Sequence, residues 1–448
     1  MGTIAAPGYS AVGAQQSVEQ KRKAAVRGAF LSEYIDMFDI YLPVVVLSPI
    51  LAYFQPPHLD AATDAILGSL VFMTTFLGRP LGSIIFGIFA DRIGRRRATI
   101  ISVAGFGVVT LLIALLPGYE TWGLASYVLL ILLRFVDGIF LGGGYTGAHP
   151  LALEYSKKAE RGFVGGLIIA AFPAAYVTIN LVSMATFAIF PLDGMHSPYA
   201  QIGWRVPFII GAALAGWLTM YYINKVSESD IWEGEKIAKK TPKSPFAELL
   251  RGRGLVVLLQ VMLMMTGYWL TQNLLTIFMP SGVLVKGLHL TGVQMSLTLM
   301  ITYTIMFFSY TGFGVLGQRI GRRKFLMWCG PAIATVGAGL MYVLANSQGA
   351  PLWQIIVTVV VMAVVISAPW GVILAYVNER FSTEVRATGF GIGFSLSVVI
   401  PSFYAFYLNW LGQAGIPGNL APSLLLILGG ILGIVGASLG PETKDVDF

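Results

Sequence analysis

Six ionisable side chains fall inside long apolar segments of this sequence, where a charge is energetically costly. The first segment contains Glu33, Asp36 and Asp39, the second contains Arg79, and the third contains Arg134 and Asp137. A charge near the centre of a membrane costs roughly 2.5–3.5 kcal/mol on insertion scales, whereas a leucine returns only about 0.5 kcal/mol. Because stability does not account for six such residues, we expect them to face a bundle interior or a wet cavity and to serve a function.

The spacing of the acids in the first segment favours proton binding. Asp36 and Asp39 are three residues apart and share a helix face, and Glu33 lies one turn earlier. We predict that Asp39 or Asp36 binds a proton opposite Arg134, because protonation neutralises a carboxylate and loosens its ion pair. The candidate proton-coupling residues are Asp39, Asp36, Arg134, Asp137 and Glu33. Two alternatives stay open. One is a static ion pair that joins two helices, and the other is a pair between Asp137 and Arg134 within one helix.

Arg79 lies near the centre of its apolar segment, and its own helix offers no acid at matching depth. A permanently charged, planar set of donors suits a carboxylate or another oxyanion. We therefore predict that Arg79 binds an anionic small molecule. The alternatives are that the side chain extends to the membrane interface, or that Glu33 neutralises it.

Neutral polar and aromatic residues complete the predicted binding site. The candidate substrate-binding residues are Arg79, Arg134, Tyr41, Tyr268, Gln272, Asn273 and Trp370. Buried amides also serve as hydrogen bonds between helices, and single aromatics often only pack. Pro369 and Gly371 flank Trp370, so we expect a broken helix at the cavity.

The composition assigns these segments to a membrane. The chain has 448 residues, of which 56% are hydrophobic and 11% charged, with a mean hydropathy of +0.75, whereas soluble proteins are about 25% charged. Apolar stretches of about 20 residues are long enough to cross a hydrocarbon core of about 30 Å. The sequence predicts twelve membrane spans, at residues 26–54, 66–90, 98–117, 122–153, 162–190, 204–224, 254–280, 292–316, 325–346, 352–377, 387–411 and 420–440.

The distribution of positive charge predicts the orientation. Of the 29 Lys and Arg residues, 25 lie on the side of the membrane that carries both termini, which predicts cytoplasmic termini. The net charge of +7 therefore reflects the placement of loops and does not indicate a nucleic-acid partner. The single cysteine, Cys329, excludes an internal disulfide and a cysteine-based metal site. The sequence has no metal-ligand cluster, phosphate loop or nucleophile–base arrangement, so we expect neither an enzyme nor a bound cofactor or metal.

The chain repeats itself at about half its length. The stretch 87–96 reappears at 314–323, an offset of 227 residues (314 minus 87), and 154–161 reappears at 379–386, an offset of 225 (379 minus 154). Two halves of six spans each have the same orientation, as in parallel repeats. The expected domains are a cytoplasmic tail (1–25), a first bundle (26–224), a cytoplasmic linker (225–253), a second bundle (254–440) and a cytoplasmic tail (441–448).

Several motifs resemble those of the major facilitator superfamily. They are the stretch 87–97 and its repeat, Arg134-x-x-x-Gly138, and the closing Pro441-Glu442-Thr443-Lys444. The runs 79–96, 142–148, 154–162 and 204–208 resemble its metabolite:proton symporter branch, although Gly144 stands where that branch usually has Glu. In related proton symporters the acid in the position of Asp39 pairs with the span-four arginine and carries the coupling proton.

The resemblance also implies a gate at the cytoplasmic side. The family's acid in the position of Asp91 engages the start of span eleven, near Ala387, and an arginine of its own loop. Glu154 with Arg161, and Glu379 with Arg386, resemble the family's cytoplasmic salt-bridge network. The gating candidates are Asp91, Arg92, Arg95, Arg96, Glu154, Arg161, Arg319, Arg322, Glu379 and Arg386. Gln318 replaces the acid in the second copy, so we expect a weaker latch there.

The sequence as a whole predicts an all-α transporter whose two six-helix bundles surround a central cavity. We expect alternating access, with proton entry coupled to uptake of a small organic anion such as a carboxylate. The alternatives are a proton-coupled carrier of a zwitterionic osmolyte or a sugar, and a membrane sensor with a transporter fold. The expected partners are this substrate, protons and the lipid bilayer, in a monomer of a plasma membrane such as the bacterial inner membrane.

Overall fold

The structure is a computed structural model that describes residues 17–57, 61–237 and 245–448, and every regular element in these ranges is a helix. The first half contains α1 (Val18–Leu42), α2 (Ala61–Ile93), α3 (Arg95–Ala114), the short α4 (Tyr119–Trp122), α5 (Leu124–Glu154), α6 (Arg161–Ile169), which α7 (Ala171–Ile189) continues, and α8 (Arg205–Lys225). Two irregular turns, Pro43–Leu47 and Ser48–Tyr53, extend α1.

The second half repeats this arrangement with more interruptions. It contains α11 (Gly252–Asn273) extended by the π-helical Leu274–Val285, α12 (Gly292–Ile320), α13 (Arg322–Ala332) with α14 (Ala338–Ala345), α15 (Leu352–Ser367) with α16 (Trp370–Glu379), α17 (Arg386–Ser395) with α18 (Val399–Ser402) and α19 (Tyr404–Gln413), and α20 (Ala421–Leu439). Between the halves lie α9 (Asp230–Ile237) and α10 (Pro245–Leu249). The break between α15 and α16 falls just before Trp370, where Pro369 and Gly371 predict it.

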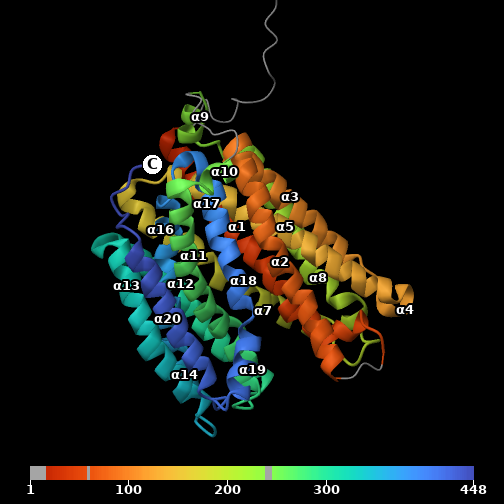
Figure 1. Cartoon of the computed structure of the whole chain (residues 1–448). Helices are drawn as coiled ribbons and strands as arrows, with labels where there is room; N and C mark the ends of the chain where they lie inside the picture. Colours follow the sequence, from red (N-terminus) through yellow and green to blue (C-terminus); the bar gives the residue numbers. More distant parts are fainter. Residues whose placement is uncertain (1–16, 58–60, 238–244) are drawn as a thin grey trace, which may run out of the picture.

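The two sets of helices lie side by side. Figure 1 shows α2, α3, α5 and α8 on one side and α12, α13, α14 and α20 on the other. The C-terminal end, α9 and α10 lie at one end of the bundle, which we call the terminal face. It corresponds to the side for which the sequence predicts the cytoplasm.

Eleven helical stretches of the described residues are long and apolar enough to cross a membrane. α1 is not among them because its three acids and polar first turns lower its hydropathy. It nevertheless packs against α5, α7 and α8, and all three acids are buried. Together these twelve units confirm the predicted all-α polytopic fold.

α1 begins eight residues earlier than the sequence predicts. Ser17 caps it: its hydroxyl accepts from the backbone N–H of Gln20, and the Gln20 side chain accepts from the Ser17 N–H. This first turn is tied to the terminal face by an ion pair of 2.8 Å between Lys21 and Asp230 and by a contact between Arg22 and Glu160. Residues 18–25 of the predicted tail thus belong to a helix that Ser17 caps, and residues 1–16 lie outside the described residues.

Glycines let α2 and α5 approach closely. A Cβ added at Gly138 would overlap the backbone carbonyl oxygen of Thr75, and one at Gly142 would overlap that of Arg79. Since backbone cannot swing away, these positions tolerate only glycine without a shift of the helices. The close approach places Arg79 against the first-half core.

Replacing Gly138 with alanine should therefore destabilise the protein. Overpacking a close helix contact costs about 1–3 kcal/mol, so we expect a lower unfolding temperature in detergent and less folded protein. Gly312→Ala is the matched control, because a Cβ there meets nothing within 4 Å. Equal unfolding temperatures for the two variants would contradict this packing.

Candidate functional site

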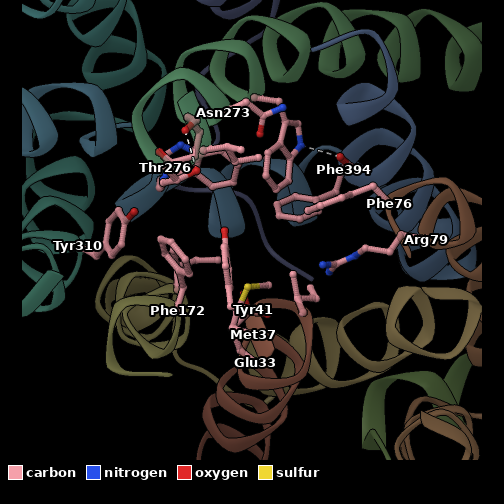
Figure 2. Close-up of a pocket in the computed structure, with 16 residues that line it drawn as sticks. Glu33, Met37, Tyr41, Phe76, Arg79, Phe172, Asn273, Thr276, Tyr310 and Phe394 are labelled. Carbon is pink, nitrogen blue, oxygen red and sulfur yellow. Dashed lines mark hydrogen bonds between the residues drawn. The ribbon is translucent and has the colours of Figure 1, made fainter. Parts of the chain in front are cut away.

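A cavity lies between the two halves at the level of the buried charges. Glu33, Tyr41 and Arg79 line it from α1 and α2, and Gln272 and Asn273 line it from α11. Figure 2 shows the Arg79 side chain and the Tyr41 ring directed into this space from the first half. Its volume of ≈ 50 Å³ accommodates only a few waters, so the cavity must widen to admit a metabolite.

Aromatic side chains are the largest group of residues in the cavity wall. They come from both halves, as Tyr41, Phe76, Phe172, Trp269, Tyr310, Trp370 and Phe394. The ring centroids of Trp269 and Trp370 are 4.5 Å apart, those of Trp269 and Phe394 are 5.3 Å apart, and Trp269 donates to the backbone oxygen of Phe394 at 2.8 Å. One wall therefore joins α11, α16 and α17 rigidly beside the charged wall of the first half.

Arg79 is neutralised by Asp36 and not by Glu33, the acid considered from the sequence. One guanidinium nitrogen lies 3.0 Å from Asp36 Oδ2, and the guanidinium carbon is 5.0 Å from the centroid of the Tyr145 ring. Glu33 instead approaches His149, with Oε2 at 3.2 Å from Nε2. We call Asp36, Arg79, Glu33 and His149 the Arg79 cluster.

Arg134 lies between two other acids. Its Nη1 is 2.7 Å from Asp137 Oδ2 on the same helix and 3.6 Å from Asp39 Oδ2 on α1. Asp39 Oδ1 accepts from the hydroxyl of Thr110 on α3 at 2.7 Å. We call Asp39, Arg134 and Asp137 the Arg134 cluster. Both pairings considered from the sequence, within α5 and between α1 and α5, thus occur at one guanidinium.

The expectation that Asp36 and Asp39 face the same arginine is wrong. Three residues along a helix turn the side chain by about 300°, so the two carboxylates diverge by about 60°. That angle directs Asp36 to Arg79 on α2 and Asp39 to Arg134 on α5. The acids therefore belong to separate clusters.

Two predicted substrate residues lie outside the cavity. Arg134 is held in its own cluster and does not line the cavity. Tyr268 is fully buried and donates to the backbone oxygen of Leu326 on α13 at 2.8 Å. Since adjacent helical residues point about 100° apart, Trp269 takes the inward position that Tyr268 was predicted to have. Tyr310 and Phe394 also line the cavity, and only the packing of the halves reveals them.

Ion pairs join the halves at the terminal face, and their partners differ from the predicted ones. Glu154 of α5 binds Arg386 of α17 at 2.7 Å, and Glu379 of α16 lies 3.8 Å from Arg161 of α6. The four residues that the sequence assigns to a salt-bridge network therefore belong to one, but each acid meets the arginine of the other half and not that of its own motif. The two halves face each other with pseudo-twofold symmetry, which brings the acid of each half to the arginine of the other.

Asp91 caps the start of α17 as the family resemblance implies. Its carboxylate accepts from the backbone N–H groups of Ala387 at 3.2 Å and Thr388 at 2.9 Å, and lies 3.3 Å from Arg95. A carboxylate at a helix N-terminus is favourable by about 0.3–1 kcal/mol. In the second copy Gln318 accepts one backbone N–H, that of Gly162, at 3.2 Å. The relative strength of the two latches stays a prediction.

The other gating candidates divide into bound and exposed residues. Arg95 lies 3.4 Å from Glu154 and donates to the backbone oxygen of Thr383 across the halves at 2.7 Å. Arg322 binds Glu379 within the second half through both ends of its guanidinium. Arg96 donates to backbone oxygens at the end of α8, Arg92 and Arg319 are exposed, and the gating role of these three arginines stays a prediction.

Residues near the end of the chain cover this network. Arg161 donates to the backbone oxygen of Val446 at 2.7 Å, and the Phe448 ring lies 3.6 Å from its guanidinium carbon and 3.7 Å from that of Arg386. Within the first half, burial raises the pKa of Glu228, which accepts the N–H of Arg96 at the start of α3. The terminal face is therefore closed by contacts that cross between the halves.

Replacing Glu154 with glutamine should loosen this closure. Arg386 and Arg95 would lose their shared anion, and breaking a buried pair costs about 3–5 kcal/mol. A cysteine at Thr146, which is buried where α5 meets α17, would report the change in a Cys329→Ser background. We expect a membrane-impermeant maleimide to label it about tenfold faster or more.

The control for this labelling experiment is Lys324→Gln, which removes an exposed charge in the first turn of α13. It should leave the rate of labelling unchanged. Equal rates for Glu154→Gln and the parent protein would show that the ion pairs do not hold the terminal face closed.

A helical membrane protein with two pseudo-symmetric halves, a cavity between them and one closed end has the architecture of a carrier. The sequence profile of the Major Facilitator Superfamily matches residues 29–405. The chain belongs to this superfamily and is a multi-pass membrane transporter.

Relatives and solved structures agree with this assignment. The proline/betaine transporter of Escherichia coli K12 is 27% identical over 449 residues, covering 95% of this chain and 84% of that protein. The shikimate transporter of the same organism is 25% identical over 436 residues, covering 93% of each. The proton:xylose symporter XylE, solved with 6-bromo-6-deoxy-D-glucose, has a TM-score of 0.76 at 17% identity, covering 95% of this chain and 97% of that one. The last comparison establishes a shared fold.

Proposed function

We propose that the protein is a proton-coupled symporter that takes up a small metabolite bearing a carboxylate. The observation that carries the proposal is Arg79, a buried guanidinium that lines the cavity between the halves and has one ion pair there, with Asp36 at 3.0 Å. A guanidinium can bind two carboxylates, since it has five N–H donors. A substrate carboxylate would therefore bind Arg79 beside Asp36 or displace it.

The hydrogen bonds of Thr110 support Asp39 as the proton-binding residue. The Thr110 hydroxyl oxygen lies 2.7 Å from Asp39 Oδ1 and 2.8 Å from the backbone oxygen of Phe106. A hydroxyl has one hydrogen, which these two acceptors share when Asp39 is ionised, whereas a proton on Asp39 donated to Thr110 would give each contact a hydrogen of its own. Loss of that proton leaves a second full negative charge beside Arg134, which already contacts Asp137. Protonation of Asp39 thus changes how tightly α1 and α5 are held together.

A zwitterionic osmolyte is the second candidate substrate. The aromatic wall around Trp269 and Trp370 faces the charged wall of Arg79, so one molecule could place a carboxylate on Arg79 and a methylated ammonium over the rings. Relatives named as proline/betaine transporters favour this candidate, whereas the relative named as a shikimate transporter favours an organic acid. Both substrate classes carry a carboxylate.

The function is tested by uptake into proteoliposomes under an imposed pH gradient. Labelled glycine betaine, proline, shikimate, a dicarboxylate and xylose would be compared, with and without an uncoupler. Uptake of a carboxylate-bearing compound that collapses with the uncoupler supports symport. Uptake of xylose alone would shift the assignment to a sugar carrier, and no flux for any compound would favour a membrane sensor.

The proposal includes an orientation and an assembly state. We place both termini in the cytoplasm of a bacterial inner membrane, on the basis of the positive charge at the terminal face. We propose a monomer, because the cavity is built entirely from one chain. Protease accessibility of the terminal face in inside-out and right-side-out vesicles would test the orientation.

A further inference from the structure

The geometry points to a second proton-binding site, formed by Glu33 and His149, that binds its proton together with the substrate at Arg79. This inference rests on the proposed function and extends it. Glu33 lines the cavity from α1, and His149 lies behind it on α5, with its Nε2 3.2 Å from Glu33 Oε2. Both side chains are buried, with exposures of 4% and 1%.

His149 is not satisfied as an ordinary buried histidine. Neither ring nitrogen has a well-formed hydrogen bond to any described residue, although buried polar groups are nearly always bonded. The unprotonated nitrogen of an imidazole and an ionised carboxylate are both acceptors, so they repel each other at 3.2 Å unless a proton lies between them. The pair is therefore suited to gain and lose a proton.

The charge balance of the interior also calls for a proton there. The two clusters contain four acids, Glu33, Asp36, Asp39 and Asp137, and two arginines, Arg79 and Arg134. Each arginine thus has one acid too many. The excess in the Arg134 cluster is offset by the proton proposed for Asp39, and the excess in the Arg79 cluster remains on Glu33. His149 is the one further basic group in either cluster.

Charged and aromatic groups from several neighbouring helices surround this pair. Arg79 on α2, Asp36 on α1 and Tyr145 on α5 face it. On α17 the Phe390 ring covers the imidazole at 5.8 Å. The nearest basic residues of α3 and α17, Arg95 and Arg386, are bound to Glu154 at the terminal face.

Substrate binding would change the proton affinity of this pair. A carboxylate that binds Arg79 competes with Asp36, and the freed negative charge increases the negative potential at Glu33. A proton from the cavity water then binds His149 Nδ1, so that the imidazole, which already directs its Nε2–H to Glu33 Oε2, becomes an imidazolium. Release of the substrate restores the pair of Arg79 with Asp36 and returns the proton to water. Binding therefore takes up a proton that is separate from the one on Asp39.

The first test needs no substrate. The chain has four histidines, His58, His149, His196 and His289, so nitrogen-15 histidine spectra in nanodiscs resolve few signals. We expect the signal of one buried imidazole to titrate between about pH 5 and 9. This signal should be absent from the spectrum of His149→Gln. In Glu33→Gln the same imidazole should bind its proton more weakly, by about tenfold or more. No titration in this range, or an identical titration in Glu33→Gln, overturns the second site whether or not the protein transports anything.

The second test uses the compound that the uptake assay identifies among glycine betaine, proline and shikimate. Calorimetry in two buffers of different ionisation enthalpy measures the protons bound with it. We expect net proton uptake per substrate bound in the parent and in Asp39→Asn, and none per substrate bound in His149→Gln. Equal uptake in parent and His149→Gln overturns the link to substrate, whereas absence of transport by the parent refutes the proposed function instead.

Discussion

Asp39→Asn should abolish accumulation of substrate against its gradient while leaving exchange of substrate across the membrane. Asparagine fills the same volume but can neither carry a negative charge nor bind the coupling proton. The contact with Arg134 at 3.6 Å would stay permanently weak, as if Asp39 were always protonated. Proton-driven accumulation should fall to the level of the uncoupled protein, and counterflow into preloaded proteoliposomes should persist.

Two matched variants show whether the effect belongs to Asp39. Asp137→Asn removes the closer acid of Arg134, at 2.7 Å, and should weaken the protein's stability more than its coupling. Thr110→Val removes the hydroxyl at 2.7 Å from Asp39 and should shift the pH dependence of accumulation without abolishing it. Full accumulation by Asp39→Asn, with loss in Asp36→Asn, would transfer the proton site to Asp36.

Arg79→Ala should remove measurable substrate affinity. A hydrogen bond to a charged group contributes about 1.5–3 kcal/mol, which corresponds to a loss of roughly 10- to 150-fold in affinity. The loss of affinity in Arg79→Ala should exceed this range, because Asp36 would remain as an unpaired buried anion near the substrate carboxylate. KM for uptake and Kd by calorimetry are the measurements.

Arg79→Lys and the double variant Arg79→Gln with Asp36→Asn separate binding from stability. Lysine keeps the charge but not the planar set of donors, so it should recover part of the affinity. The double variant leaves no unpaired charge and should fold well, yet still fail to bind a carboxylate. Unchanged affinity in any of these variants would remove Arg79 from the binding site.

The fold was largely readable from the chain. Long apolar stretches, the repeated motifs at 87–96 and 314–323, and the excess of Lys and Arg on one side predict twelve spans in two halves. These signals are local, since each depends on about 20 residues and on the hydrocarbon thickness. The start of α1 was missed because the Ser17 cap precedes a polar turn that carries no apolar signal.

The members of the site were predicted better than their partners. Tyr41, Arg79, Gln272, Asn273 and Trp370 do line the cavity, because a polar or aromatic residue within an apolar span is itself a signal. The prediction that Tyr268 lines the cavity is wrong by one residue, because Trp269 takes that position and neighbours on a helix point about 100° apart. Trp269 could have been recognised only from the orientation of α11.

The amino-acid sequence alone is enough to predict a membrane-spanning protein of two related halves, with its buried charges concentrated in the first half. The tertiary structure decided which charges meet. Rotation of α1 sends Asp36 to Arg79, Asp39 to Arg134 and Glu33 to His149. The pseudo-twofold packing sends Glu154 and Glu379 to arginines of the opposite half. Burial cost depends on composition and is therefore visible along the chain, whereas pairing depends on the rotation and contact of helices far apart in it.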